Sequence, residues 1–195
     1  MRRLTPQTPD PELLRAYRAG ELRAWDLLVA RYEVLVCAIP RRMGLSASDV
    51  EDVAQTVFIA LLNHVDKLQQ ESRLSAWLVT TAKRESWRLV QRQRTRRLTE
   101  LPETETSTLE QLPDSEDAAL PEASVIALEE QHLVRQALSQ LLERCRELLT
   151  LLYKDDPPLA YALIAERLGI PVGSIGPQRA RCLERLKKIL HTLDF

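Results

Sequence analysis

The sequence predicts an all-α protein made of two small helical domains joined by a flexible acidic linker. Its 195 residues include only five glycines, and aromatic residues make up 5% of the chain. Hydrophobic residues make up 45%, which is enough for packed cores, and they recur at three- and four-residue intervals. This pattern favours helices over strands. We expect the domains at residues 1–97 and 125–195, with the linker at 98–124.

The first domain is expected to hold four helices. Apolar spacing indicates two helices over residues 10–38, broken near Gly20. Ser46 or Ser48 is a candidate N-cap for a third helix, over about residues 49–65. A fourth helix follows a polar turn and covers about residues 74–94. Trp25 and Trp77 are in phase with apolar neighbours, so we expect both in the core.

The net charge of −1 hides two opposite charge runs. Residues 83–97 hold seven basic residues against one acidic residue, a local charge of +6. Residues 98–130 hold ten acidic residues and no Lys or Arg, a local charge of −10. The prolines and polar residues of 99–123 leave too few large apolar side chains for a core, so this segment is the expected linker.

Apolar periodicity resumes at Val125 and ends before the Pro-Pro pair at 157–158. Residues 162–189 then predict a helix, a tight turn and a basic helix. Gly169 can supply a left-handed residue after the first of these helices, and Ser174 can cap the second. The basic helix has an apolar seam made of Ile175, Leu183, Leu186 and Leu190. This arrangement is typical of a helix-turn-helix that enters the DNA major groove.

The basic helix of the first domain predicts a second contact with nucleic acid. Arg84, Arg88 and Arg92 recur every four residues and can follow a phosphate backbone. Trp87 lies on the adjoining stripe and either stacks on an unpaired base or packs on the protein. The alternative is that this arginine-rich helix end is only a solvated face, favoured by the helix dipole.

The residue pattern predicts no catalytic site, metal or cofactor. There is no Gly-rich phosphate loop, and the histidines lack partners at ligand or triad spacing, so we expect most of them on the surface; they are His64, His132 and His191. The cysteines are odd in number, far apart and without C-x-x-C spacing, which points to a reducing cytosol; they are Cys37, Cys145 and Cys182. No apolar run approaches the roughly 20 residues of a membrane span. We therefore expect a cytoplasmic protein that does not insert into membranes.

Four sequence boxes, in order, resemble the extracytoplasmic-function group of the sigma-70 family. DVEDVAQTVF at 49–58 is similar to the family box D-A-E-D-V-V-Q-E-V-F, and LSAWLVTTA at 74–82 is similar to F-x-x-W-L-x-x-I-A. Residues 137–147 resemble A-L-x-x-L-P-x-x-x-R-E. Residues 164–175 resemble I-A-x-x-L-G-x-x-x-G-T-V and precede an R-A-R-x-x-L-E-R-L-like helix.

The resemblance implies a sigma factor, a non-enzymatic protein that binds core RNA polymerase and directs promoter-specific transcription. The first domain would correspond to sigma region 2 and the second to sigma region 4. The implied polymerase-binding residues are Asp49, Asp52, Gln55 and Phe58. The residues implied to contact the opened −10 element are Lys67, Arg73, Lys83, Arg84, Trp87, Arg88, Gln91 and Arg92. The residues implied to contact duplex DNA at the −35 element are Ser174, Gln178, Arg179, Arg181 and Arg185. An anti-sigma factor is a further partner that the resemblance implies.

Three alternatives stay open at the level of the sequence. The acidic residues at 49–52 are also explained by the positive end of a helix dipole. An autonomous helix-turn-helix regulator would bind duplex DNA without polymerase. A metal-dependent enzyme would require His64, His132 and a cysteine to converge. The basic helix of the helix-turn-helix also differs from the family pattern near its start. Gly176 offers no side chain there, and Pro177 is expected to fit only in the first turn of a helix.

Overall fold

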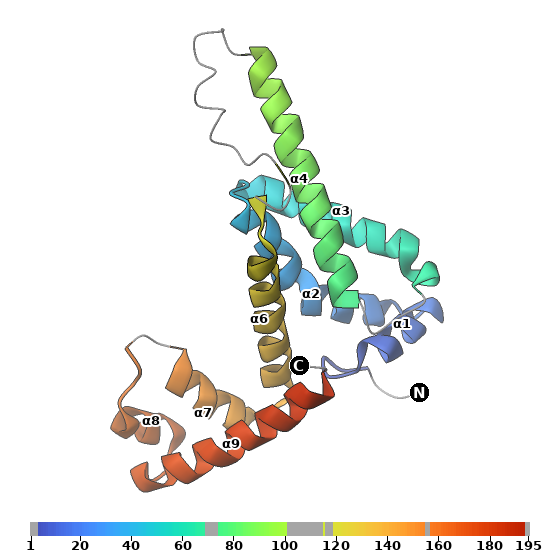
Figure 1. Cartoon of the computed structure of the whole chain (residues 1–195). Helices are drawn as coiled ribbons and strands as arrows, with labels where there is room; N and C mark the ends of the chain where they lie inside the picture. The colour runs from blue at the N-terminus through green and yellow to red at the C-terminus, as the bar shows by residue number, and fades with distance from the viewer. Residues whose placement is uncertain (1–3, 69–73, 101–114, 116–118, 155–156, 194–195) are drawn as a thin grey trace. The chain divides into compact units, whose positions relative to one another are not determined.

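The computed structural model describes residues 4–68, 74–100, 115, 119–154 and 157–193. Every regular element in these ranges is helical, which confirms the all-α prediction (Figure 1). The chain forms two compact units, residues 1–132 and 133–195, which meet inside one helix. The expected domain boundary at 124–125 falls nearer the start of that helix. Within the described residues, no helix combines the length and apolar character needed to cross a membrane.

The described part of the first unit begins with α1 (Asp10–Arg18), α2 (Leu22–Arg42), α3 (Ala47–His64), the short 3-10 helix η1 (Val65–Lys67) and α4 (Leu74–Glu100). The expected break near Gly20 is confirmed, because this glycine adopts a φ of 91° between α1 and α2. Ser46 is confirmed as the N-cap of α3, where it forms a capping box with Asp49. The fourth helix extends to Glu100, beyond its predicted end.

A single apolar core joins these helices. Leucines with relative exposure of 1% or less come from every α-helix of the bundle, namely Leu13, Leu14, Leu28, Leu35, Leu61, Leu74 and Leu78. Burying a leucine side chain contributes about 2 kcal/mol relative to leaving it exposed. Trp25 and Trp77 are half-buried and pack against this core, in agreement with their predicted role.

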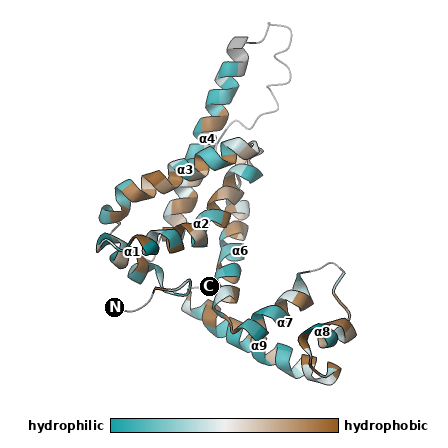
Figure 2. Ribbon diagram, turned by 180° about the vertical axis from the view of Figure 1, so that it is seen from behind, coloured by the Kyte–Doolittle hydropathy of each residue, from teal (hydrophilic) through white to brown (hydrophobic). Residues whose placement is uncertain are grey.

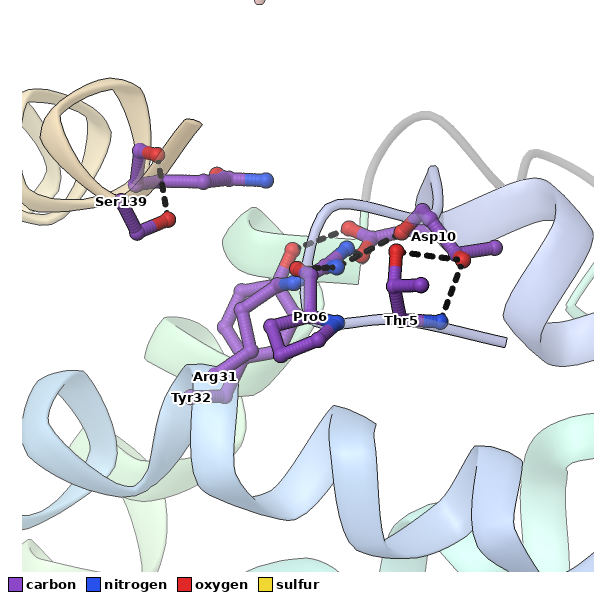
Figure 3. Close-up of polar contacts among 8 residues, drawn as sticks. Thr5, Pro6, Asp10, Arg31, Tyr32 and Ser139 are labelled. Carbon is purple, nitrogen blue, oxygen red and sulfur yellow. Dashed lines mark hydrogen bonds and ion pairs between the residues drawn. The ribbon is translucent and has the colours of Figure 1, made fainter. Parts of the chain in front are cut away.

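The chain before α1 is held on α2 by a polar cluster (Figure 3). Arg31 donates to the carbonyl oxygens of Pro6 and Thr8, at 2.7 and 2.6 Å, and forms an ion pair with Asp10. Tyr32 donates to the other carboxylate oxygen of Asp10. Burial first, and then the charge of Asp10, raise the pKa of the Tyr32 hydroxyl well above its ordinary value. Tyr32 therefore remains a protonated hydrogen-bond donor at neutral pH.

The first half of α6 (Glu122–Gln140) also belongs to the first unit. Leu120 and Leu128 are buried in its core, although Leu120 lies in the segment expected to be linker. His132 is 4% exposed, and its ring stacks on Tyr32 with centroids 4.8 Å apart. Most of the histidines were expected on the surface, and His132 is the exception, since His64 and His191 are exposed. Its burial depends on the packing of α6 against α2, which local spacing does not encode.

The second unit contains the rest of α6 together with α7 (Glu143–Tyr153), α8 (Tyr161–Leu168) and α9 (Val172–Thr192). The apolar periodicity over 125–152 is divided between α6 and α7, because Leu142 adopts an extended ψ of 142° at the start of α7. The small core of this unit includes Leu148, Leu149, Ile164 and Ile175.

A disulfide joins Cys145 of α7 to Cys182 of α9, with the two Cα atoms 5.3 Å apart. The third cysteine, Cys37, is a buried free thiol in the first unit. The cysteine count and spacing pointed to a reducing compartment and contained no sign of this pair. The bond depends on the packing of α7 against α9, since the two cysteines lie 37 residues apart in the sequence.

Candidate nucleic-acid interface

The exposed face of α3 carries two of the four expected polymerase-binding residues. Asp52 and Gln55 are exposed, on the side of the helix opposite the buried Val50 and Val57. Thr56 extends this polar face and donates to the carbonyl oxygen of Asp52 at 2.8 Å. The two side chains therefore lie on one solvent-exposed face of α3.

The other two expected polymerase-binding residues, Asp49 and Phe58, make contacts within the first unit. Asp49 accepts from the Ser46 hydroxyl at 2.6 Å, and this hydrogen bond, followed by one from Gln93, lowers the pKa of its carboxyl. Phe58 is half-buried and meets Trp25 edge to face, with ring centroids 6.3 Å apart. The helix-start explanation of Asp49 therefore holds in the structure.

The arginine strip of α4 lies in the open. Arg84, Arg88 and Arg92 are all exposed, whereas Ala82 and Ser86 face the core. In both views α4 extends past α2 and α3, and Figure 2 shows that hydrophilic residues predominate on this projecting part. Arg88 forms an ion pair with Glu85 at 2.6 Å. The strip is therefore a continuous cationic surface. Its charge is partly neutralised at Arg88, by Glu85.

The stripe beside the arginines is half-buried and consists of Lys83, Trp87 and Gln91. Trp87 is neither enclosed by the core nor fully open. Trp87 is therefore partly exposed to solvent beside the arginine strip.

A groove between α3 and α4 brings the two predicted surfaces together. It is lined by Asp52, Val53, Thr56, Glu85, Leu89, Arg92, Gln93 and Arg96. Carboxylates from both helices and guanidinium groups from α4 therefore share one depression. The sequence boxes suggested one surface for polymerase on α3 and a separate one for DNA on α4, and their adjacency emerges only from the packing.

The backbone directly after α3 is held by hydrogen bonds from a side chain of α1. Arg18 of α1 donates to the carbonyl oxygens of Val65 and Leu68, at 2.6 and 3.3 Å. Lys67, a predicted −10 contact, is exposed in η1. Arg73, the other predicted contact in this segment, lies outside the described residues. Arg18 was missed by the sequence reasoning, because its partners are carbonyl groups about 50 residues away.

In the second unit, α8 and α9 form the expected helix-turn-helix. Gly169 ends α8 with the predicted left-handed conformation, at φ 62° and ψ 38°. However, α9 begins at Val172 with Pro171 as its N-cap, so Ser174 lies within the first turn and is not the cap. Its hydroxyl donates to the Pro171 carbonyl oxygen at 2.7 Å. Pro177 consequently falls in the second turn, not the first as expected.

The expected −35 residues do not all point freely to solvent. Gln178 is half-buried and donates to the Ser174 hydroxyl at 3.1 Å. Arg179 donates to the Tyr161 hydroxyl of α8 at 3.1 Å, and Arg181 is exposed. Arg185 is exposed, and its guanidinium lies 3.8 Å from the Cys145 sulfur. Tyr161 is a supporting residue that the sequence reasoning missed.

The buried side of α9 agrees with the expected seam at Ile175 and Leu186 and departs from it at Leu183. Ile175 and Cys182 are its buried residues, whereas Leu183 is 38% exposed. Leu186 is half-buried and packs against the core. The register of the helix therefore turns Cys182 inward where a leucine was expected.

The described residues contain no group of His, Cys, Asp and Glu side chains arranged to hold a metal ion. His64 and His132 belong to the first unit, whereas the paired cysteines lie in the second. The convergence that a metal-dependent enzyme would need is therefore not found among these residues.

Comparison with known proteins identifies relatives over nearly the whole chain. Residues 28–96, which span most of α2 through α4, match the family model Sigma-70 region 2. The RNA polymerase sigma-H factor of Pseudomonas aeruginosa is 29% identical over 191 residues, covering 96% of each chain. The ECF RNA polymerase sigma factor SigW of Bacillus subtilis is 27% identical, covering 92% of this chain and 96% of the relative.

The ECF RNA polymerase sigma-E factor of Escherichia coli K12 is also 27% identical, covering 94% of this chain and 95% of the relative. Among solved structures, one titled "Structure of CnrH in complex with the cytosolic domain of CnrY" matches 94% of this chain and 97% of that chain. The identity is 22% and the TM-score 0.36. The region 2 match and the near full-length relatives agree with the four sequence boxes, and together they support an extracytoplasmic-function sigma factor of the sigma-70 family.

Proposed function

We propose that this protein binds core RNA polymerase and directs it to specific promoters. The observation that carries the proposal is the region 2 match at residues 28–96. This region includes both the exposed polar face of α3 and the whole arginine strip of α4. The role is non-catalytic, because RNA synthesis would be performed by the polymerase. The place of action is then the cytoplasm.

Polymerase docking is assigned to Asp52 and Gln55. Both side chains are exposed on one face of a helix whose opposite face is anchored in the core. A rigid helix holds its side chains in place before binding, so little conformational entropy is lost on association. Asp49 and Phe58 support this face from within the fold, through the capping box and the contact with Trp25.

The first unit would capture the opened −10 element with α4. The arginine strip can follow the backbone phosphates, and the half-buried Trp87 offers a ring face beside it. Stacking of an unpaired base on an aromatic ring is worth about 1–3 kcal/mol where it occurs. Contacts of this kind offset part of the cost of separating the strands.

The second unit would bind duplex DNA at the −35 element through α9. Gln178 and the arginines at 179, 181 and 185 supply amide and guanidinium donors for base edges and phosphates. Because Gly176 has no side chain and Pro177 lies in the second turn, readout would begin at Gln178. The two units would thus contact two separate promoter elements.

Run-off transcription with purified core polymerase on genomic fragments tests the proposal. We expect promoter-specific transcripts with the wild-type protein and their loss in the double variant Asp52→Ala/Gln55→Ala. The matched control is Asp26→Ala/Gln131→Ala, which removes an exposed acid and an exposed amide elsewhere in the first unit. The control is expected to keep full transcription.

An autonomous helix-turn-helix regulator predicts a different outcome. Such a protein would bind a specific duplex tightly without polymerase, and the Asp52→Ala/Gln55→Ala variant would bind it equally well. That result, together with no stimulation of core polymerase, would overturn the proposed function. An anti-sigma factor stays a prediction of the family resemblance, and an inhibitory protein that co-purifies with the chain would identify it.

A further inference from the structure

The disulfide of the second unit joins the proposed DNA-reading helix to its support. Along its 21 residues, α9 has two buried residues, Ile175 and Cys182. Cys182 is bonded to Cys145, which is itself a buried residue of α7. One of the two buried attachments of α9 is therefore a covalent bond that can be opened by reduction. The oxidation state of this pair bears directly on how firmly α9 is held.

A cation lies beside the sulfur atoms. The Arg185 guanidinium is 3.8 Å from the Cys145 sulfur, and this arginine is exposed, whereas the two cysteines are 4% and 5% exposed. After reduction, a guanidinium at this distance stabilises the thiolate, which is the nucleophilic form of cysteine. The buried pair is therefore in contact with an exposed cation that favours its reactive state after reduction.

The remaining cysteine has the opposite character. Burial is the main reason why the pKa of the Cys37 thiol is raised, and Cys37 belongs to the core of the first unit. A protonated, buried thiol reacts slowly. The chain thus contains an unreactive cysteine that serves as an internal reference for the paired ones.

We propose that Cys145 and Cys182 form a reversible thiol-disulfide site that is oxidised by hydroperoxides and whose disulfide holds α9 in its DNA-binding position. Disulfides of proteins in reducing compartments are usually transient, catalytic or redox-sensing. The thiol chemistry is independent of the proposed function, whereas its effect on promoter binding rests on that function.

The oxidation is a two-electron reaction in two steps. The Cys145 thiolate attacks a peroxide oxygen, which breaks the O–O bond, gives a sulfenic acid and releases an alcohol, or water from hydrogen peroxide. The Cys182 thiolate then attacks the sulfenic sulfur, forms the S–S bond and expels hydroxide, which leaves as water. Two thiols lose two electrons and two protons, and the hydroperoxide is reduced to an alcohol and water. A dithiol reductant reverses the reaction by exchange.

Opening the bond is expected to loosen the second unit. The disulfide closes a loop across a sequence separation of 37 residues, which restricts the unfolded chain, and the core of this unit is small. We expect reduction to lower the melting temperature of the second unit by about 10 °C or more. A less ordered α9 must be fixed when it binds DNA, so we expect promoter-specific transcription to fall about fivefold or more.

Peptide mapping of the full chain tests the thiol site. After reduction, treatment with hydrogen peroxide and blocking of thiols, we expect a Cys145–Cys182 linked peptide that dithiothreitol removes, with Cys37 unlinked. Arg185→Gln is expected to slow formation of the bond severalfold, whereas Lys188→Gln, which removes an exposed cation from the same helix, leaves the rate unchanged. Absence of the linked peptide, or equal rates in all three proteins, overturns the site as proposed.

Comparison of oxidised and reduced wild-type protein tests the effect on α9 without relying on the folding of a variant. Melting curves and run-off transcription are measured on both states, and Cys145→Ser/Cys182→Ser serves as the peroxide-insensitive control for effects on the polymerase. Equal melting temperatures and equal transcription in the two states overturn the proposal. A linked peptide and a melting shift, without transcription in either state, support the redox site and overturn the sigma-factor function.

Discussion

Arg31 and Asp10 form an ion pair that ties the start of α1 to the middle of α2. Their side chains are 6% and 16% exposed, so neither charge is well solvated. Arg31 also donates to two carbonyl groups of the segment before α1, which satisfies further donors of its guanidinium. The pair is therefore a polar anchor between α1 and α2.

Asp10→Ala is expected to lower the free energy of unfolding of the first unit by about 3 kcal/mol. Removing one partner of a buried ion pair leaves the other charge uncompensated, and this costs about 3–5 kcal/mol. Urea unfolding of the full chain measures the change. Asp26→Ala, an exposed acid of α2, is the control and is expected to stay within about 0.5 kcal/mol of wild type. A loss below about 1 kcal/mol for Asp10→Ala would contradict the anchoring role.

Tyr32 is expected to make the first unit sensitive to alkaline pH. Its pKa is raised in the folded protein, so the unfolded chain loses the phenolic proton first, near pH 10 by the ordinary value of about 10. The stability from this group is full below that pH and is lost as pH rises, by at most about 1.4 kcal/mol per pH unit.

Urea unfolding of wild type and Tyr32→Phe, compared from about pH 8 to pH 11, measures this effect. The variant is expected to be about 1 kcal/mol less stable at the lower pH, because it loses the hydrogen bond to Asp10. The difference should shrink as pH rises, and Tyr153→Phe, at an exposed tyrosine, should show no such convergence. A constant difference across the range would count against the raised pKa.

Substitutions of Asp49 and Asp52 are expected to have different effects, the first on stability and the second on polymerase binding. Asp49→Ala removes the capping box of α3 and should cost about 1 kcal/mol of stability, with modest loss of polymerase affinity. Asp52→Ala removes an exposed carboxylate and should weaken polymerase binding with little change in stability. Thermal unfolding and titration of labelled core polymerase measure the two quantities. A large loss of polymerase affinity without loss of stability in Asp49→Ala would instead place Asp49 in the docking surface.

The arginine strip of α4 is expected to govern the salt dependence of promoter binding. If Arg84 and Arg92 each neutralise a phosphate, replacing either by Gln should reduce the slope of log K against log salt by about one. Arg88→Gln should reduce it less, because Glu85 already pairs with this arginine. Arg23→Gln, at an exposed arginine of α2, is the control. Unchanged slopes for all three strip variants would leave the strip as a solvated face.

Much of the fold could be predicted because it follows from local rules. Ser46 caps α3 through a hydroxyl and a carboxylate three residues apart, and Gly169 ends α8 because glycine tolerates a positive φ. The exposed Asp52 and Arg92 also follow from helical spacing, since each lies opposite a buried apolar stripe. The start of α9 was mispredicted because Ser174 has the side chain typical of an N-cap, whereas the N-cap is Pro171, three residues earlier.

The sequence by itself determined the helices, their caps and the faces that bury apolar side chains, because these depend on neighbours within a few residues. It also contains the four boxes that resemble those of the sigma-70 family. Only the tertiary structure decided which distant side chains meet. The Cys145–Cys182 bond, the stacking of His132 on Tyr32 and the groove shared by Asp52 and Arg92 each depend on how two helices pack. Helix packing is set by the combined fit of many apolar contacts. The spacing of residues in the sequence therefore does not predict these pairs.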